Sequence, residues 1–189
     1  PATPEVRSAL APTGTLRINA PRAACELVLA PLLGRFFAAN PGMRVELVAE
    51  DAFIDIVATG FDAGVRFGES LQQDMVAVPL GPPQRFVVVA SPDYLAAHGT
   101  PLCPRELQQH RCVRIRFPNG SYYRWEFARG SEQFEIEVDG PVAVSQMPLM
   151  ISAAEQGLGL AYVYAQYAAE PVAAGRLLTV LTDWCPEIP

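Results

Sequence analysis

The sequence predicts an α/β protein built from two Rossmann-like lobes, and three observations lead to this fold class. In the first seventy residues, short strand-like segments alternate with helical segments, as in right-handed crossovers on a parallel sheet. A similar alternation returns in the second half without any sequence repeat. The chain has 189 residues, 50% of them hydrophobic and 18% charged, which suits one large domain or two small ones.

The first half supplies the elements of lobe one. A strand is expected over residues 15–20, where apolar and polar residues alternate, and Pro21 ends it. The helix expected over 24–39 is apolar nearly all round, so it needs cover on more than one side. Pro31 inside it implies either a kink or the start of a new helix. A short helix is expected over 52–59, and further strands over 45–48, 62–67, 75–80 and 85–90, the last two as a hairpin-like pair.

The second half supplies lobe two. Ser91 and Pro92 open a predicted helix over 92–98, with Ser91 as its cap. Gly157 closes another over 147–156. Short helices are expected over 105–109 and 165–169, and strands over 112–116, 122–128, 134–138, 142–144, 158–163 and 177–181. Residues 15–90 are thus expected to form lobe one, 91–181 lobe two, and 182–189 a return toward lobe one, after a Pro/Ala-rich linker over 1–14.

Charge and residue usage exclude several functions. The chain carries 20 acidic and 14 basic residues, for a net charge of −6, whereas a module that grips nucleic acid is usually basic. Every basic residue is arginine, which excludes lysine Schiff-base chemistry and the lysine of a phosphate-binding loop. An anion site must therefore use arginine or backbone N–H groups.

Cysteine and histidine spacing predicts no metal site. The four cysteines form no CxxC pair and are expected to be reduced, mostly buried thiols of a cytosolic protein. The two histidines lie in polar, turn-like settings, which favours surface or packing roles. No apolar stretch is long enough for a membrane span. No catalytic motif such as GxSxG, HExxH or GxGxxG after a strand occurs, which disfavours an enzyme and a bound cofactor. The four cysteines are Cys25, Cys103, Cys112 and Cys185, and the two histidines are His98 and His110.

The candidate ligand contacts are the residues that follow the strands, because ligands of open α/β sheets bind beyond the carboxyl ends of the strands. Each has an alternative role: ion pairing for the arginines, helix capping for Ser145 and Gln146, and packing for one of Tyr162 and Tyr164. The candidates from this pattern are Pro21, Arg22, Ala23, Arg66, Phe67, Gly68, Ser145, Gln146, Met147, Tyr162 and Tyr164.

An ordered set of segments resembles the effector-binding domain of LysR-type transcriptional regulators. The segments are GTLRINAPRAACELVLAPLLGRFFAANPGMRVEL, DAGVRFG, RFVVVASPDYLAAHGTP, LQQHRCVRIRFPNG, YYRWEF, GPVAVSQMPLMISAAEQGLGLAY and AAGRLLTVLTDWCP. The resemblance implies a fold like that of periplasmic solute-binding proteins of the second type, with a small effector in a cleft between the lobes. It adds a hinge at Ser91 to the candidate contacts, and it implies neither catalysis nor a cofactor.

The resemblance also implies partners. A winged helix-turn-helix upstream, of which only the linker tail PEVRSAL is expected here, would bind DNA, and the domains would pair as a homodimer or homotetramer through helices 24–39 and 147–156. The family's final strand and helix are expected to be missing. Where the family often has a hydroxyl for an effector carboxylate, Ala23 and Ala24 have none, so Arg22, Arg66 or backbone N–H groups would hold an anionic effector. The alternatives are a transporter's solute-binding protein and an enzyme on the same fold.

Overall fold

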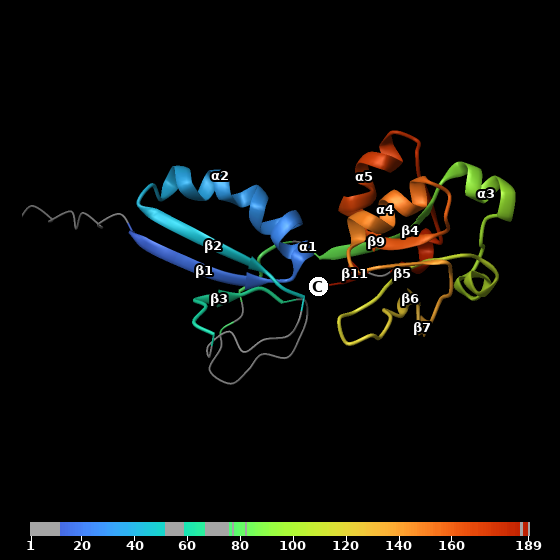
Figure 1. Ribbon diagram of the computed structural model, residues 1–189, viewed down its shortest axis with the longest axis horizontal. Helices are drawn as coiled ribbons and strands as arrows, with labels where there is room; N and C mark the ends of the chain where they lie inside the picture. Colours follow the sequence, from blue (N-terminus) through green and yellow to red (C-terminus); the bar gives the residue numbers. More distant parts are fainter. Residues whose placement is uncertain are drawn as a thin grey trace, which may run out of the picture. The chain divides into compact units, whose positions relative to one another are not determined.

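The computed structural model describes residues 12–51, 59–66, 76, 78–81, 83–185, 187 and 188. The chain divides into two compact units, unit 1 over residues 1–81 and unit 2 over residues 82–189. Each unit combines strands and helices, as the sequence predicts (Figure 1).

Unit 1 contains a parallel sheet. Strand β1 (Gly14–Ala20) lies between β2 (Met43–Ala49) and β3 (Ala63–Gly64), and both neighbours run parallel to it. The predicted order of strand, helix and parallel strand is therefore confirmed. The third strand is shorter than predicted, because only Ala63 and Gly64 pair with β1. The helix predicted over 52–59 falls almost entirely outside the described residues.

One helical run connects β1 to β2. It consists of α1 (Arg22–Ala24), a π-helical turn η1 (Cys25–Leu29) and α2 (Ala30–Ala39). The N–H of Ala30 donates to the carbonyl of Cys25, five residues back. Pro31 is the next residue and has no N–H to donate. The change of hydrogen-bond register just before it therefore leaves no backbone donor unpaired at that point. The helical run thus continues past Pro31 after one widened turn.

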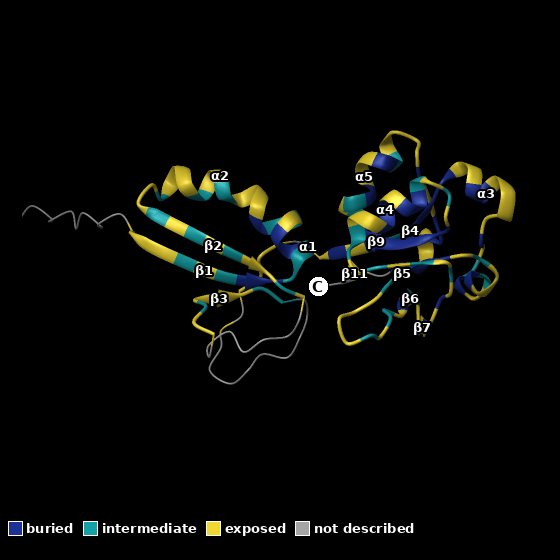
Figure 2. Ribbon diagram, in the orientation of Figure 1, coloured by how far each residue is buried: buried dark blue, intermediate teal, exposed yellow. Residues whose placement is uncertain are grey.

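The helical run buries only its first half. Ala24, Cys25 and Leu29 form a core with Ala20 of β1. In α2, all of whose residues are described, no side chain is buried, and Leu32 and Phe37 are 39% and 37% exposed. Figure 2 shows α2 largely in the yellow of exposed residues. An apolar helix with this exposure needs a cover that the described residues of unit 1 do not supply.

Unit 2 is organised around strand β4 (Gln84–Ala90). Three later strands pair with it, all antiparallel: β9 (Ala161–Tyr164), β10 (Leu178–Val180) and β11 (Glu187–Ile188). Because β4 pairs with these strands, the division of the chain lies at residues 81–82. The sequence instead places β4 in lobe one. The predicted strand over 75–80 is not seen at its described residues, 76 and 78–80.

The remaining elements of unit 2 follow the predicted order. Strands β5 (Val113–Ile115) and β8 (Val142–Val144) are parallel, and β6 (Trp125–Arg129) and β7 (Glu132–Ile136) form a hairpin. The helical elements are α3 (Pro92–His98), the 3-10 helix η2 (Pro104–Gln109), α4 (Met147–Glu155), α5 (Ala165–Ala173) and the 3-10 turn η3 (Thr182–Trp184). The segment after residue 181 belongs to unit 2, since β11 pairs with β4.

An aromatic cluster fills the core of unit 2. Tyr162 on β9 is 1% exposed, and its ring stacks on Phe86 of β4 with centroids 4.5 Å apart. Trp125 and Phe127 of β6 lie at 5.4 Å and 5.6 Å from the same ring. The Tyr162 hydroxyl donates to the carbonyl of Glu126 at 2.6 Å. The cluster therefore joins the β4–β9 pair to the β6–β7 hairpin, and both strands of that pair are mostly buried (Figure 2).

The Tyr162 hydroxyl tests this connection. Tyr162→Phe removes the partly buried bond to the Glu126 carbonyl, so we expect a loss of about 0.5–1.5 kcal/mol in unfolding free energy. Urea unfolding followed by tryptophan fluorescence measures it, since Trp125 and Trp184 both lie in unit 2. An unchanged unfolding midpoint would contradict the structural role of this hydroxyl.

A close backbone approach at Gly140 generates a second prediction. A Cβ at this position would lie 2.1 Å from the carbonyl oxygen and 2.6 Å from the nitrogen of Cys112. We expect Gly140→Ala to cost about 1–3 kcal/mol or more, because both partners are backbone and cannot move aside.

Gly130, in the β6–β7 turn, provides the matched control. It has φ +61°, and no atom lies within 4 Å of the place that a Cβ would take, so Gly130→Ala costs only left-handed strain of about 1–2 kcal/mol, and Gly130→Asn less. Urea unfolding of the variants checks this. If Gly140→Ala were as stable as Gly130→Asn, the close approach to Cys112 would be wrong.

Candidate functional site

The carboxyl ends of β1 and β3 hold an arginine in place. Asn19 on β1 pairs with Gly64 on β3, and the N–H of Val65 donates to the Asn19 carbonyl at 2.9 Å. Arg66 follows, and its Nη2 donates to Asn19 Oδ1 at 2.6 Å while its Nη1 donates to the Val65 carbonyl at 2.7 Å. Arg66 is therefore fixed at the end of the sheet by its neighbours.

Asn19 is a site residue that the sequence analysis did not select. Strand alternation places it among the outward polar residues, yet its side chain is 0% exposed. Its Nδ2 has no hydrogen-bond partner among the described residues, and a buried amide donor without a partner costs about 1–3 kcal/mol. The sequence feature that points to Asn19 is its position, next to last in a strand that ends at a candidate site.

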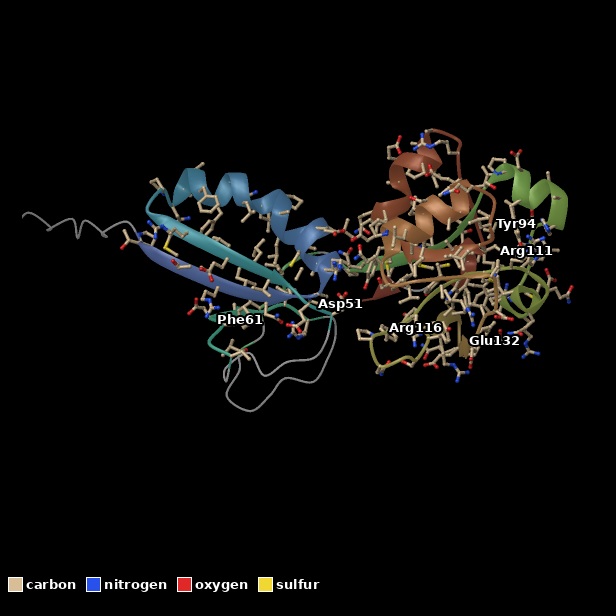
Figure 3. All side chains as sticks on the ribbon, in the orientation of Figure 1. Asp51, Phe61, Tyr94, Arg111, Arg116 and Glu132 are labelled. Carbon is tan, nitrogen blue, oxygen red and sulfur yellow. The ribbon has the colours of Figure 1, made fainter. Side chains whose placement is uncertain are left out.

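The start of α1 is occupied by a carboxylate from the same unit. Pro21 is the extended residue before the helix, and the Arg22 N–H donates to Asp51 Oδ1 at 2.9 Å. The Arg22 guanidinium also pairs with Asp51, with Nε 3.6 Å from Oδ2. Arg22 thus has the ion-paired role that the sequence left open. Asp51, just after β2, is labelled in Figure 3, and it is not among the candidates from the sequence.

The remaining unit 1 candidates are Ala23, Phe67 and Gly68. Ala23 is half-buried at the second position of α1, where a helix has no acceptor of its own for the N–H. Phe67 and Gly68 lie outside the described residues.

In unit 2, the carboxyl ends of β5 and β8 bring Arg116 beside Ser145. The strands end with the pair Ile115 and Val144, and the Arg116 N–H donates to the Val144 carbonyl at 2.8 Å. Arg116, labelled in Figure 3, is exposed, and its guanidinium makes no hydrogen bond or ion pair with another described residue. The sequence analysis did not select it, although it follows its strand as Ser145 follows β8.

The start of α4 has no side-chain cap. Gln146 is the extended residue before the helix, but neither it nor Ser145 makes a capping hydrogen bond. The capping roles that the sequence left open are therefore absent at this helix end. Ser145 is exposed and Met147 half-buried. Uncapped N–H groups and the positive end of the helix dipole favour a negative group here.

Three candidates have structural roles in unit 2. The Ser91 side chain, 5% exposed, accepts from the N–H of Tyr94 at 3.2 Å and caps α3, as the sequence predicts. Tyr162 lies in the aromatic core, and Tyr164 is 8% exposed with its ring 4.3 Å from Phe86. Burial raises the pKa of Tyr162. Packing, the alternative left open for one of these tyrosines, thus applies to both.

The described residues offer no metal centre, and three of the four thiols are buried. Within the described part of the chain, no group of three His, Cys, Asp or Glu side chains could hold a metal ion. All four cysteines are free, and Cys25, Cys112 and Cys185 are buried. Burial raises the pKa of Cys112 to about 12 and that of Cys185 to about 11, so neither forms thiolate near neutral pH. None of the described helices is long and apolar enough to cross a membrane.

Known relatives of this chain are transcriptional regulators. The chain is 40% identical over 180 residues to the HTH-type transcriptional regulator YcaN of Escherichia coli (strain K12), covering 95% of this chain and 59% of that protein. A putative transcriptional regulator of Pseudomonas aeruginosa (strain PAO1) is 41% identical over 179 residues, with 94% of this chain and 58% of that protein covered. The chain therefore spans a little under three fifths of these relatives.

Solved structures agree with the fold. The full-length virulence activator AphB of Vibrio cholerae, described as a member of the LTTR family, matches with a TM-score of 0.79 at 26% identity, covering 94% of this chain and 59% of that one. CrgA of Neisseria meningitidis, a LysR-type transcriptional regulator, matches with a TM-score of 0.76 at 26% identity and covers 94% of this chain and 60% of that one. The predicted two-lobed, periplasmic-binding-protein-like fold is thereby confirmed.

The family assignment rests on almost the whole chain. The family model described as the LysR substrate binding domain matches residues 10–189. Together with the named relatives and the shared fold, this match confirms the resemblance carried by the sequence segments and sets aside a transporter's solute-binding protein. The chain belongs to the LysR substrate-binding domain family, the effector-binding part of LysR-type transcriptional regulators.

Proposed function

We propose that this domain binds a small anionic effector and, without breaking any bond, passes the binding signal to the DNA-binding part of a cytoplasmic LysR-type regulator. The observation that carries the proposal is an arginine at the carboxyl end of a parallel strand in each unit, Arg66 after β3 and Arg116 after β5. Arginine suits carboxylates because its planar fork donates two parallel hydrogen bonds.

The unit 1 contacts are Arg66 and the start of α1. Asn19 and the Val65 carbonyl orient Arg66, so less side-chain entropy is lost when it binds a ligand. Asp51 already pairs with Arg22, so the Arg22 guanidinium would have to exchange this carboxylate for an effector. Pro21 and Ala23 complete this part of the site, together with Phe67 and Gly68 from the sequence prediction.

The unit 2 contacts are Arg116, Ser145, Gln146 and Met147. Arg116 and the uncapped start of α4 both favour negative charge, and Ser145 lies beside Arg116 across the β5–β8 pair. An effector that contacts both units would favour one arrangement of the lobes, and it can shift that equilibrium only by its difference in affinity for the arrangements, typically about 1–3 kcal/mol.

DNA binding belongs elsewhere in the regulator. The net charge of −6 disfavours contact with phosphates, and the relatives are longer than this chain. The domain instead pairs with a second copy in a homodimer or homotetramer. The exposed apolar face of α2 supports this, since the described part of unit 1 leaves Leu32 and Phe37 exposed, and α4 presents Leu149 at 50% exposure.

A ligand screen tests the effector proposal. Thermal shift against a panel of small carboxylates and their neutral amides should yield an anionic binder that, at 100 times its Kd, stabilises the domain by about 2.7 kcal/mol. Arg66→Ala and Arg116→Ala should each weaken the carboxylate more than its amide. Arg124→Ala, on the β6 side of an exposed ion pair with Glu135, is the matched control and should change neither.

Two results would contradict the proposal. If an arginine variant weakened the acid and the amide equally, that arginine would be structural. If a bound compound were converted to product, the enzyme alternative would replace the sensor.

Self-association gives a separate prediction. Phe37→Glu places a charge on the exposed apolar face of α2 and should weaken dimerisation by tenfold or more, about 1.4 kcal/mol, while unfolding of the monomer changes little. Sedimentation velocity over a concentration series measures it, with Arg35→Glu as the control for added negative charge on α2. A wild-type chain that stays monomeric at the highest concentration would rule out this interface.

A further inference from the structure

Both histidines of the chain contact the same tyrosine. Tyr94 on α3 is 2% exposed. The His98 ring stacks on the Tyr94 ring with centroids 4.4 Å apart, and its Nδ1 lies 3.1 Å from the Tyr94 carbonyl. From the other side, His110 Nδ1 lies 3.2 Å from the Tyr94 hydroxyl. Sequence analysis gave each histidine a separate surface or packing role and did not bring them together.

The Tyr94 hydroxyl connects α3 to the segment that leads into β5. It accepts from the Arg111 N–H at 2.9 Å (Figure 3). Its own proton has two acceptors within reach, His110 Nδ1 at 3.2 Å and the Arg111 carbonyl at 3.4 Å. The Arg111 carbonyl already accepts from Leu160 N–H at 2.9 Å. His110 Nδ1 is therefore the nearer and less occupied acceptor, which requires it to be unprotonated.

His98 belongs to the same cluster through two contacts. Its Nδ1 lies against the Tyr94 carbonyl, and its Nε2 lies 3.4 Å from the Arg111 guanidinium. Because Arg111 already brings one positive charge to the buried tyrosine, a protonated His110 would add a second cation to the cluster and would turn its Nδ1 from an acceptor into a donor.

Some neighbouring groups favour protonation of His110 and others oppose it. Glu106 on η2 faces His110 and favours its protonated form, although its carboxylate already accepts from the Leu102 N–H at 2.8 Å. Burial and the neighbouring His98 oppose protonation of His110 and lower its pKa. Cys112, at the start of β5, is the remaining titratable neighbour of Tyr94 and stays protonated.

Little else fastens α3 to unit 2. Of its seven residues, only Tyr94 and Leu95 are buried. We propose that Tyr94, His98, His110 and Arg111 form an acid-sensitive joint that holds α3 against the start of β5 at neutral pH and releases it when the His110 imidazole is protonated. The domain would then carry a pH response that needs no effector.

Hydrogen exchange of this chain at pH 7.5 and pH 5.5, corrected for intrinsic exchange rates, tests the proposal. The reporters are the α3 amides of Leu95, bonded to Ser91, and of the following Gly99, bonded to Leu95. We expect their opening equilibrium to rise about fivefold at pH 5.5, the equivalent of about 1 kcal/mol of like-charge repulsion. Amides of α4 are the internal control and should change much less.

The double variant His98→Gln/His110→Gln should lose this pH dependence, because glutamine does not titrate. A wild-type α3 as protected at pH 5.5 as at pH 7.5 would overturn the proposal, as would a variant that keeps the response or an equal rise in α4. If the variant does not fold, an NMR titration of the wild-type imidazoles decides: the His110 midpoint must match that of the α3 amide shifts, and different midpoints would refute the joint.

Discussion

The pairing of β4 with strands from the end of the chain is the constraint on which unit 2 depends. Residues 84–90 form antiparallel ladders with β9, β10 and β11, so segments separated by seventy to a hundred residues are joined at one strand. This pairing buries Phe86 under Tyr162 and thereby fixes the aromatic cluster that supports the β6–β7 hairpin. It also places the Ser91 cap and α3 directly after a buried strand.

The candidate contacts share a second constraint, the parallel direction of neighbouring strands. In unit 1 this direction brings Asn19 to Arg66, and in unit 2 it brings Arg116 to Ser145. The two sites nevertheless differ in charge balance. Asp51 shields the start of α1, whereas the described surroundings of Arg116 and α4 provide no such carboxylate. A single anionic group would therefore be held differently in the two units.

Local patterns predicted most elements, because they depend on neighbouring residues. The Ser91–Pro92 helix start, the strand over 142–144 and the parallel β1–β2 pair follow from capping, branching and alternation. The pairing of β4 depends on distant strands, so alternation alone grouped it with the elements that precede it. The burial of Tyr162 is likewise not visible in strand spacing, which does not show which face a core will cover. The bonds from Asn19 to Arg66 and from Asp51 to Arg22 span 47 and 29 residues, beyond any local pattern.

The π-helical turn at Cys25–Leu29 determines which surface α2 presents. One extra residue in that turn rotates everything after it by about 100° relative to an uninterrupted α-helix. Removing a single residue between the turn and Pro31 would let the hydrogen-bond ladder close regularly and would rotate Leu32 and Phe37 by about 100° around the helix axis. The length of this segment, and not only its composition, therefore determines the direction in which the exposed apolar face of α2 points.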